Sequence, residues 1–212
     1  MNFTLANWLN PPEVSSVTAT SASLTAQPKT DLWQRSYYGF RRDNAPALLI
    51  ERTDNFTFTV KASFAYKAKY DQCGVLLYLD GDTWCKASLE YETPEFSRLG
   101  SVVTNYGHSD WATTDVDSPV VGKTASHWYR LSRRGPDFLL EASEDGRIFT
   151  QLRIFHMHAL GETSLDMGQQ DVLPDDGQAV RVGIYACSPL DSSFEVRFDE
   201  ARLEPSTWRA EG

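Results

Sequence analysis

The sequence has little positive charge, few cysteines and no long hydrophobic run, and each shortage argues against a class of protein. Lys and Arg total 20 against 29 Asp and Glu in 212 residues, which gives a formal net charge of −9. An acidic surface repels phosphate backbones, so we expect no nucleic-acid partner. The longest apolar runs, such as residues 75–79 (VLLYL), are far below the roughly 20 residues of a membrane-spanning helix. We therefore expect no membrane partner. The first eight residues also lack the charged and apolar parts of a signal peptide, which favours a cytoplasmic location.

The cysteines and histidines are too few and too poorly spaced to predict a disulfide framework or a metal centre. Cys73, Cys85 and Cys187 are odd in number and match no zinc-binding spacing. His156 and His158 would share one side of a strand, yet no third ligand lies near them. The aspartate pairs, which occur at 80/82, 115/117 and 175/176, lack the spacing of a calcium-binding helix–loop–helix and suit ordinary turns. We expect no metal and no cofactor.

An alternation of apolar and polar residues dominates the chain and predicts strands. It runs through residues 56–64 (FTFTVKASF), and two further strand-like runs, 73–79 and 83–91, flank Asp80-Gly81-Asp82. An Asp-Gly pair between such runs indicates a hairpin whose turn residues have positive φ. Gly135-Pro136-Asp137 and Glu144-Asp145-Gly146 predict further hairpins, whereas residues 152–167 favour only a short helix or a loop. Evenly spaced strands with no dividing linker predict an all-β jelly-roll sandwich that forms a single domain over residues 1–212.

The alternation also sorts the first hairpin into two faces. Val75, Leu77, Cys85, Ala87 and Leu89 fit the core, so the opposite face carries Tyr78, Trp84, Lys86, Ser88 and Glu90. Aromatic rings beside charged hydrogen-bonding groups suit a sugar, because pyranose C–H groups pack on a ring while hydroxyls take directed hydrogen bonds. The alternative is an ordinary Lys–Glu pair on a sheet covered by aromatics. Outside the hairpin, the candidate ligand contacts are Asn105, Trp111 and Arg130, and Trp33 is a candidate wall of a cleft.

Glu90 and Glu92 are the candidate catalytic residues, although we expect a binding protein rather than an enzyme. They loosely match the E-x-D-x-E strand of jelly-roll endoglucanases, where alternate acids project into one cleft. The third acid, Glu95, comes one residue late and follows Pro94, which the interior of a strand rarely admits.

Eight segments in order resemble the bacterial YesU-like family of concanavalin A-like proteins, which includes the fungal regulators of enolase. They are residues 74–78 (GVLLY), 84–91 (WCKASLEY), 99–104 (LGSVVT), 109–111 (SDW), 128–131 (WYRL), 143–149 (SEDGRIF), 182–189 (VGIYACSP) and 196–199 (VRFD). The resemblance implies a concanavalin A-like lectin/glucanase jelly roll, with two antiparallel sheets and a concave face. The family supplies no established catalytic residues, and a sugar ligand is an analogy from the fold.

Three functions follow as hypotheses. The first is a non-catalytic protein that binds a sugar or oligosaccharide on the concave face. The second is a protein-interaction or regulatory module of metabolism, for example a homodimer formed through an outer sheet face. The third is a glycoside hydrolase or lyase in which Glu90 or Glu92 acts as acid or base.

Overall fold

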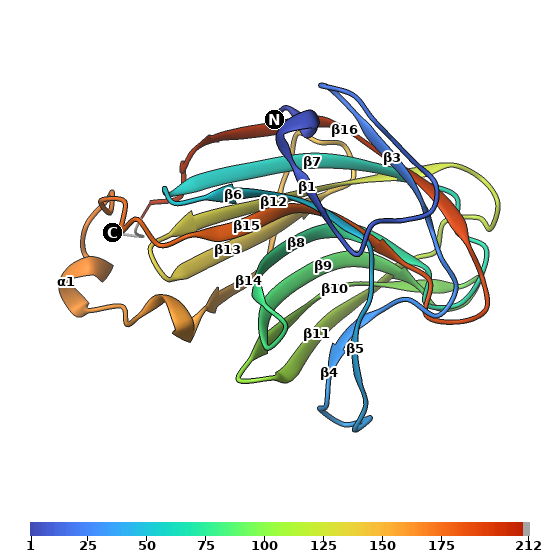
Figure 1. Cartoon of the computed structure of the whole chain (residues 1–212), viewed down its shortest axis with the longest axis horizontal. Coiled ribbons are helices and arrows are strands. Elements are labelled where there is room, and N and C mark those ends of the chain that lie inside the picture. Colours follow the sequence, from blue (N-terminus) through green and yellow to red (C-terminus); the bar gives the residue numbers. More distant parts are fainter. Residues whose placement is uncertain (210–212) are drawn as a thin grey trace.

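The computed structural model describes residues 1–209, and two seven-stranded antiparallel sheets dominate it (Figure 1). Sheet A has the order β1-β6-β15-β8-β9-β10-β11, and sheet B has the order β14-β13-β12-β7-β16-β3-β2. Strands make up 56% of the chain and helix only 5%, so the predicted all-β jelly-roll sandwich is confirmed. The strands of sheet A are β1 (Asn7–Leu9), β6 (Ala47–Arg52), β8 (Gln72–Asp80), β9 (Thr83–Tyr91), β10 (Phe96–Asn105), β11 (His108–Asp117) and β15 (Val180–Cys187).

The remaining elements belong to sheet B or lie outside both large sheets. Sheet B contains β2 (Ser15–Val17), β3 (Ala22–Ala26), β7 (Phe56–Phe64), β12 (Ala125–Arg134), β13 (Asp137–Ser143), β14 (Thr150–His156) and β16 (Phe194–Pro205). A separate two-stranded sheet joins β4 (Leu32–Gln34) to β5 (Arg41–Asp43). The short helices are η1 (Phe3–Leu5), η2 (His158–Leu160) and α1 (Leu165–Gly168). None of the helices among the described residues is long and apolar enough to cross a bilayer.

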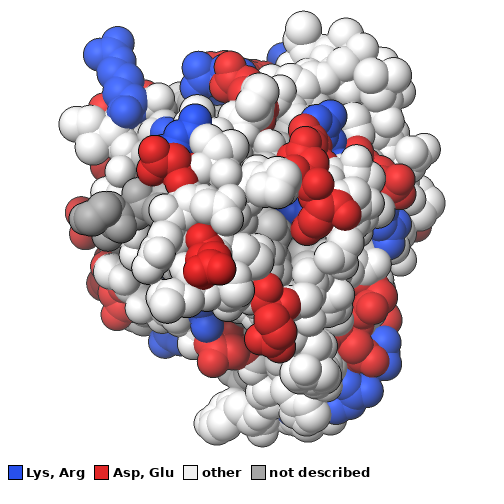
Figure 2. Space-filling view, turned by 90° about the vertical axis from the view of Figure 1, so that its left-hand side faces the viewer, with Lys and Arg blue, Asp and Glu red and all other residues white. Residues whose placement is uncertain are grey.

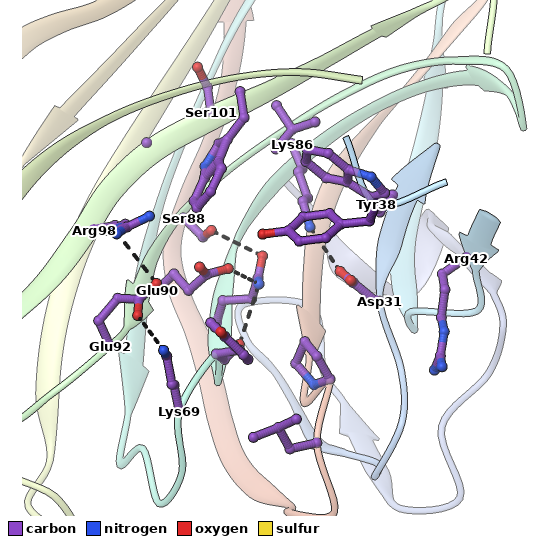
Figure 3. A pocket seen from close by; sticks show the side chains of 18 of the residues that line it. Asp31, Tyr38, Arg42, Lys69, Lys86, Ser88, Glu90, Glu92, Arg98 and Ser101 are labelled. Atoms are coloured by element: carbon purple, nitrogen blue, oxygen red, sulfur yellow. Dashed lines mark hydrogen bonds and ion pairs between the residues drawn. The ribbon is translucent and has the colours of Figure 1, made fainter. Parts of the chain in front are cut away.

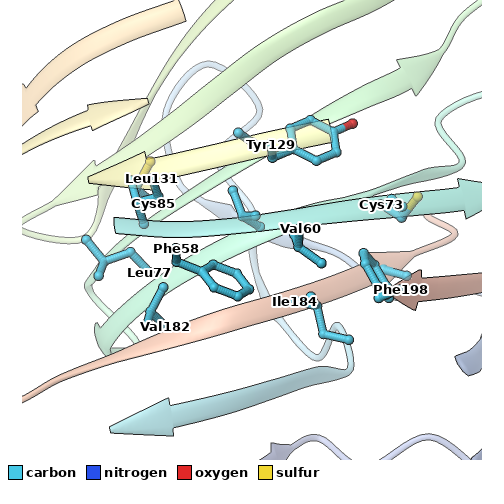
Figure 4. Close-up of a cluster of buried hydrophobic side chains, with 14 of the residues drawn as sticks. Phe58, Val60, Cys73, Leu77, Cys85, Tyr129, Leu131, Val182, Ile184 and Phe198 are labelled. Atoms are coloured by element: carbon cyan, nitrogen blue, oxygen red, sulfur yellow. The ribbon is translucent and has the colours of Figure 1, made fainter. Parts of the chain in front are cut away.

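The main core lies between the two sheets and follows the predicted alternation. Phe58 and Val60 of sheet B meet Leu77 and Ile184 of sheet A, and all four side chains are buried (Figure 4). Cys73 and Cys85 lie in the same cluster as buried thiols. The side chains of β8 and β9 that alternate with these core residues therefore point to the other face of sheet A, as the pattern predicted.

The predicted hairpins at Asp80-Gly81-Asp82 and at Gly135-Pro136-Asp137 are both present, but the backbone predicted for the first turn is not. Gly135 has φ +61° between β12 and β13. In the first hairpin neither Gly81 nor Asp82 has a positive φ, so that part of the prediction is wrong. A bulge between Tyr78 and Asp80 changes the register there, and a bulge alters the twist that a two-residue turn must match.

Tyr106 (φ +51°) and Gly107 (φ +70°) form a tight turn between β10 and β11, so Trp111 lies within a strand. Residues 152–167 form a helix or loop only in part. Strand β14 continues to His156, and η2 and α1 follow it.

Candidate functional site

A cavity of about 450 Å³ opens on the face of sheet A that points away from sheet B. Strands β8 to β11 form its floor, and the segment that contains β4 and β5 forms one wall (Figure 3). Its lining comprises Asp31, Trp33, Tyr38, Phe40, Arg42, Lys69, Tyr70, Gln72, Lys86, Ser88, Glu90, Glu92, Arg98, Gly100, Ser101, Val102, Trp111, Pro189 and Leu190. The volume falls in the range that small-molecule sites occupy, roughly 300–1,000 Å³.

Two groups of ion pairs anchor the floor. Lys86 Nζ lies 3.0 Å from Asp31 Oδ1, and both side chains are almost fully buried. Glu92, also buried, lies 3.1 Å from Lys69 Nζ through Oε2 and 3.5 Å from Arg98 Nε through Oε1. Because each buried charge has an opposite charge beside it, the floor can hold these groups in fixed positions.

Glu90 lies between these groups and accepts a hydrogen bond from the Gln72 amide. The Gln72 carbonyl in turn accepts hydrogen bonds from Tyr185 (2.9 Å) and Ser88 (3.4 Å), which orients the amide. Burial raises the pKa of Glu90 to about 7, against the lowering effect of Lys86. Glu90 therefore exchanges a proton near neutral pH.

Aromatic rings form the upper walls. Trp33 contacts Tyr38 and Trp111 edge-on, with ring centroids 5.4 Å and 6.3 Å apart. Tyr38 stacks on Phe40 at 5.6 Å. Figure 3 shows the Tyr38 hydroxyl reaching over the cavity toward Ser88 and Glu90. These walls offer flat apolar surfaces above a polar floor.

The β4–β5 segment also builds a second small core on this face of sheet A, and that core corrects part of the predicted site. Trp84 is fully buried and Tyr78 is 8% exposed, because both pack against Leu32 and Trp33. They lie on the predicted face of the sheet, but the expectation that they are open to a ligand is wrong. Neither of them lines the cavity.

The structure separates the other predicted contacts. Lys86, Glu90 and Trp111 line the cavity together, and so do Glu92 and Trp33. Asn105 lies elsewhere, because its side chain bonds to the His156 carbonyl (3.1 Å) and to His158 Nδ1 (2.6 Å).

Arg130 lies on sheet B, far from the predicted face. It forms a double hydrogen bond with Glu141 at 2.6 Å and covers the ring of Phe149. Grouping Arg130 and Asn105 with the cavity is therefore wrong, because a single strand pattern does not say which sheet or which edge a residue occupies.

Several cavity residues were missed by the sequence reasoning. Asp31, Tyr38, Gln72 and Arg98 belong to no motif that would distinguish them. For Asp31 and Tyr38 the one sequence signal is the polar and aromatic stretch at residues 31–38, which also contains the candidate wall residue Trp33. Pairing of Asp31 with Lys86 joins residues 55 positions apart, and no local pattern reports such a contact.

The described residues offer no grouping suited to a metal ion. Among residues 1–209 no set of three or more His, Cys, Asp or Glu side chains is arranged to hold one. Burial raises the pKa of Cys85 to about 12, and it also raises those of Cys73 and Cys187. Buried thiols of this kind are poor nucleophiles and poor ligands at neutral pH.

Residues 8–206 match the family described as "Protein of unknown function (DUF1349)". The chain belongs to this family. A yeast relative, "Regulation of enolase protein 1" of Saccharomyces cerevisiae, is 31% identical over 196 residues, which is 92% of this chain and 87% of the relative. The predicted resemblance to the fungal regulators of enolase is thus confirmed.

Solved structures place this DUF1349 chain among jelly-roll proteins. A crystal structure of a functionally unknown protein from Saccharomyces cerevisiae is 27% identical, with a TM-score of 0.79 over 98% of this chain and all of that one. The GH43 protein BlXynB of Bacillus licheniformis is 17% identical, with a TM-score of 0.60 over 87% of this chain. Only 32% of BlXynB is covered, so this likeness concerns the fold of one part of it.

Proposed function

We propose that the cavity on sheet A binds a sugar or oligosaccharide without transforming it. The observation that carries the proposal is the pairing of aromatic walls with a floor of fixed charged and amide groups. A pyranose ring can pack its C–H face on Trp111 or Tyr38 while its hydroxyls bond to Lys86, Ser88, Gln72 or Glu90. The β-sandwich fold, shared with a part of a GH43 protein, is consistent with this use.

Titration calorimetry against a panel of mono- and oligosaccharides tests the proposal. Tyr38→Ala should weaken sugar binding about fivefold, since a ring contact of this kind contributes roughly 1 kcal/mol. Tyr106→Ala is the matched control, because Tyr106 is also an exposed tyrosine but lies in the β10–β11 turn and does not line the cavity. Absence of binding to every sugar at millimolar concentration would reject the proposal.

A second candidate function is a glycoside hydrolase or lyase, and the state of Glu90 is the observation that favours it. A general acid must carry a proton at the working pH, and the pKa of Glu90 of about 7 meets this requirement. Glu92 is less suited, because Lys69 and Arg98 both engage its carboxylate. With an oligosaccharide that binds, Glu90→Gln should abolish release of reducing ends and preserve binding. Unchanged turnover would remove Glu90 from the mechanism.

A further inference from the structure

The charge of the cavity is opposite in sign to the charge of the whole chain. Four cationic side chains line it (Arg42, Lys69, Lys86 and Arg98) against three acidic ones (Asp31, Glu90 and Glu92). The chain as a whole carries a formal net charge of −9. The excess of positive charge in this cavity is one with Glu90 ionised and two with Glu90 protonated, and a local field of this sign favours an anionic ligand.

Three of the four cations are already engaged by groups of the protein. Lys86 pairs with Asp31, and Lys69 pairs with Glu92. Arg42 donates a hydrogen bond of 3.0 Å from Nη1 to the Lys29 carbonyl, at the outer end of the wall. The two lysines balance carboxylates of the protein, whereas Arg42 contacts a neutral carbonyl oxygen.

Arg98 differs from the two lysines because both of its outer nitrogens are free of hydrogen bonds among the described residues. Its Nε lies 3.5 Å from Glu92 and 4.0 Å from Asp115, whereas neither Nη atom takes part in a hydrogen bond among residues 1–209. Its guanidinium carbon lies 5.2 Å from the centroid of the Trp111 ring, which holds the group in place. The side chain is 32% exposed, so the two Nη groups can reach a ligand.

We infer that the sugar bound in the cavity is acidic, and that its ring carboxylate pairs with the Nη groups of Arg98 while the ring packs beside Trp111. The inference rests on the proposed sugar-binding function and names its ligand class, a saccharide containing uronic acid. A planar guanidinium suits a carboxylate, because two parallel N–H groups match two oxygens.

Matched ligand pairs test the inference by titration calorimetry on the full chain. The first pair is oligogalacturonate and the corresponding galactose oligomer, and the second is glucuronic acid and glucose. Glucose 6-phosphate tests whether a phosphate binds in place of a carboxylate. We expect the acidic member of at least one pair to bind at least tenfold more tightly than its neutral partner. Arg98→Gln should reduce that advantage to less than threefold.

Arg130→Gln is the matched control, since Arg130 also contacts a glutamate and an aromatic ring but lies on sheet B. It should keep the full preference for the acidic sugar. Arg98→Lys retains the charge and the contact with Glu92, so it should keep part of the preference for the acidic sugar. The thermal unfolding of this variant shows whether a substitution at position 98 lowers the stability of the protein.

The outcomes separate the two proposals. Neutral sugars that bind as tightly as their acidic partners would overturn the inference and leave sugar binding in place. A preference for glucose 6-phosphate over glucuronic acid would also overturn the assignment to a carboxylate. If no sugar of any charge binds, the proposed function fails, and this inference fails with it.

Discussion

Glu90 is the residue whose chemistry depends most on its neighbours. Lys86 lies four residues away on the same face of β9, yet Lys86 is paired with Asp31 rather than with Glu90. Asp31 and Glu92 add negative charge near Glu90, and burial raises its pKa to about 7. An isolated Lys–Glu pair on an exposed strand would leave the glutamate ionised at neutral pH. Burial is therefore the main reason that Glu90 is unusual, and the negative charge of Asp31 adds to it.

The raised pKa of Glu90 predicts a loss of stability as the pH rises. In the unfolded chain the carboxyl group titrates near 4.5, whereas in the folded protein it keeps its proton up to about pH 7. Stability from this group is fully present below pH 4.5 and is lost as the pH rises through 7. Between pH 5 and pH 8 the free energy of unfolding should fall by about 2 kcal/mol more in the native protein than in Glu90→Gln.

Urea unfolding at a series of pH values measures this difference. The charged groups that face Glu90 are Lys86 on β9, Asp31 before β4, Glu92 after β9 and Arg98 on β10. They are the same in both proteins, so their own titration largely cancels. If the free energy of unfolding depends on pH in the same way in the native protein and in Glu90→Gln, the raised pKa of Glu90 is contradicted.

The β4–β5 hairpin is the element that turns a flat sheet face into a cavity. Its residues bury Trp84 and Tyr78 at one end of sheet A, and its aromatic side chains wall the cavity next to them. Without it, strands β8 to β11 would present their polar face directly to solvent (Figures 1 and 3). Both the site and the burial of the predicted aromatic pair thus follow from one short segment.

Within sheet A, Gly74 allows two strands to approach closely. A Cβ atom at this position would lie 1.9 Å from the Ala87 carbonyl oxygen of β9. Gly74→Ala must therefore displace backbone, and we expect it to lower the free energy of unfolding by about 3 kcal/mol. Gly168→Ala is the control, because no atom lies within 4 Å of a Cβ there. Guanidinium unfolding measures the stability of both variants. Equal free energies of unfolding for Gly74→Ala and Gly168→Ala would contradict the tight packing at Gly74.

For the whole molecule, a single domain over residues 1–212 stays a prediction. The main core joins both sheets, and the smaller core shares sheet A with it. We expect one cooperative unfolding transition in scanning calorimetry, with calorimetric and van't Hoff enthalpies that agree. Two separate transitions would show that the β4–β5 layer or one sheet unfolds independently.

The charge of the whole molecule also bears on its partners. On the face shown in Figure 2, acidic side chains lie scattered among uncharged residues, with Lys and Arg side chains close to several of them. The predicted homodimer stays a prediction, which light scattering can measure. A ligand in the cavity meets the charges of the cavity lining, where cationic side chains outnumber acidic ones, rather than the net charge of the whole chain.

The sequence by itself determined the strands, the two faces of the first hairpin and the family, because alternation along a strand is a local property and matching segments keep their order. It also placed Lys86, Glu90, Trp111 and Trp33 among the candidates that line the cavity. Only the tertiary structure decided which outward-facing residues stay open. Trp84 is covered, Arg130 lies on the other sheet, and Arg98 and Asp31 join the site, because these outcomes depend on contacts between segments tens of residues apart.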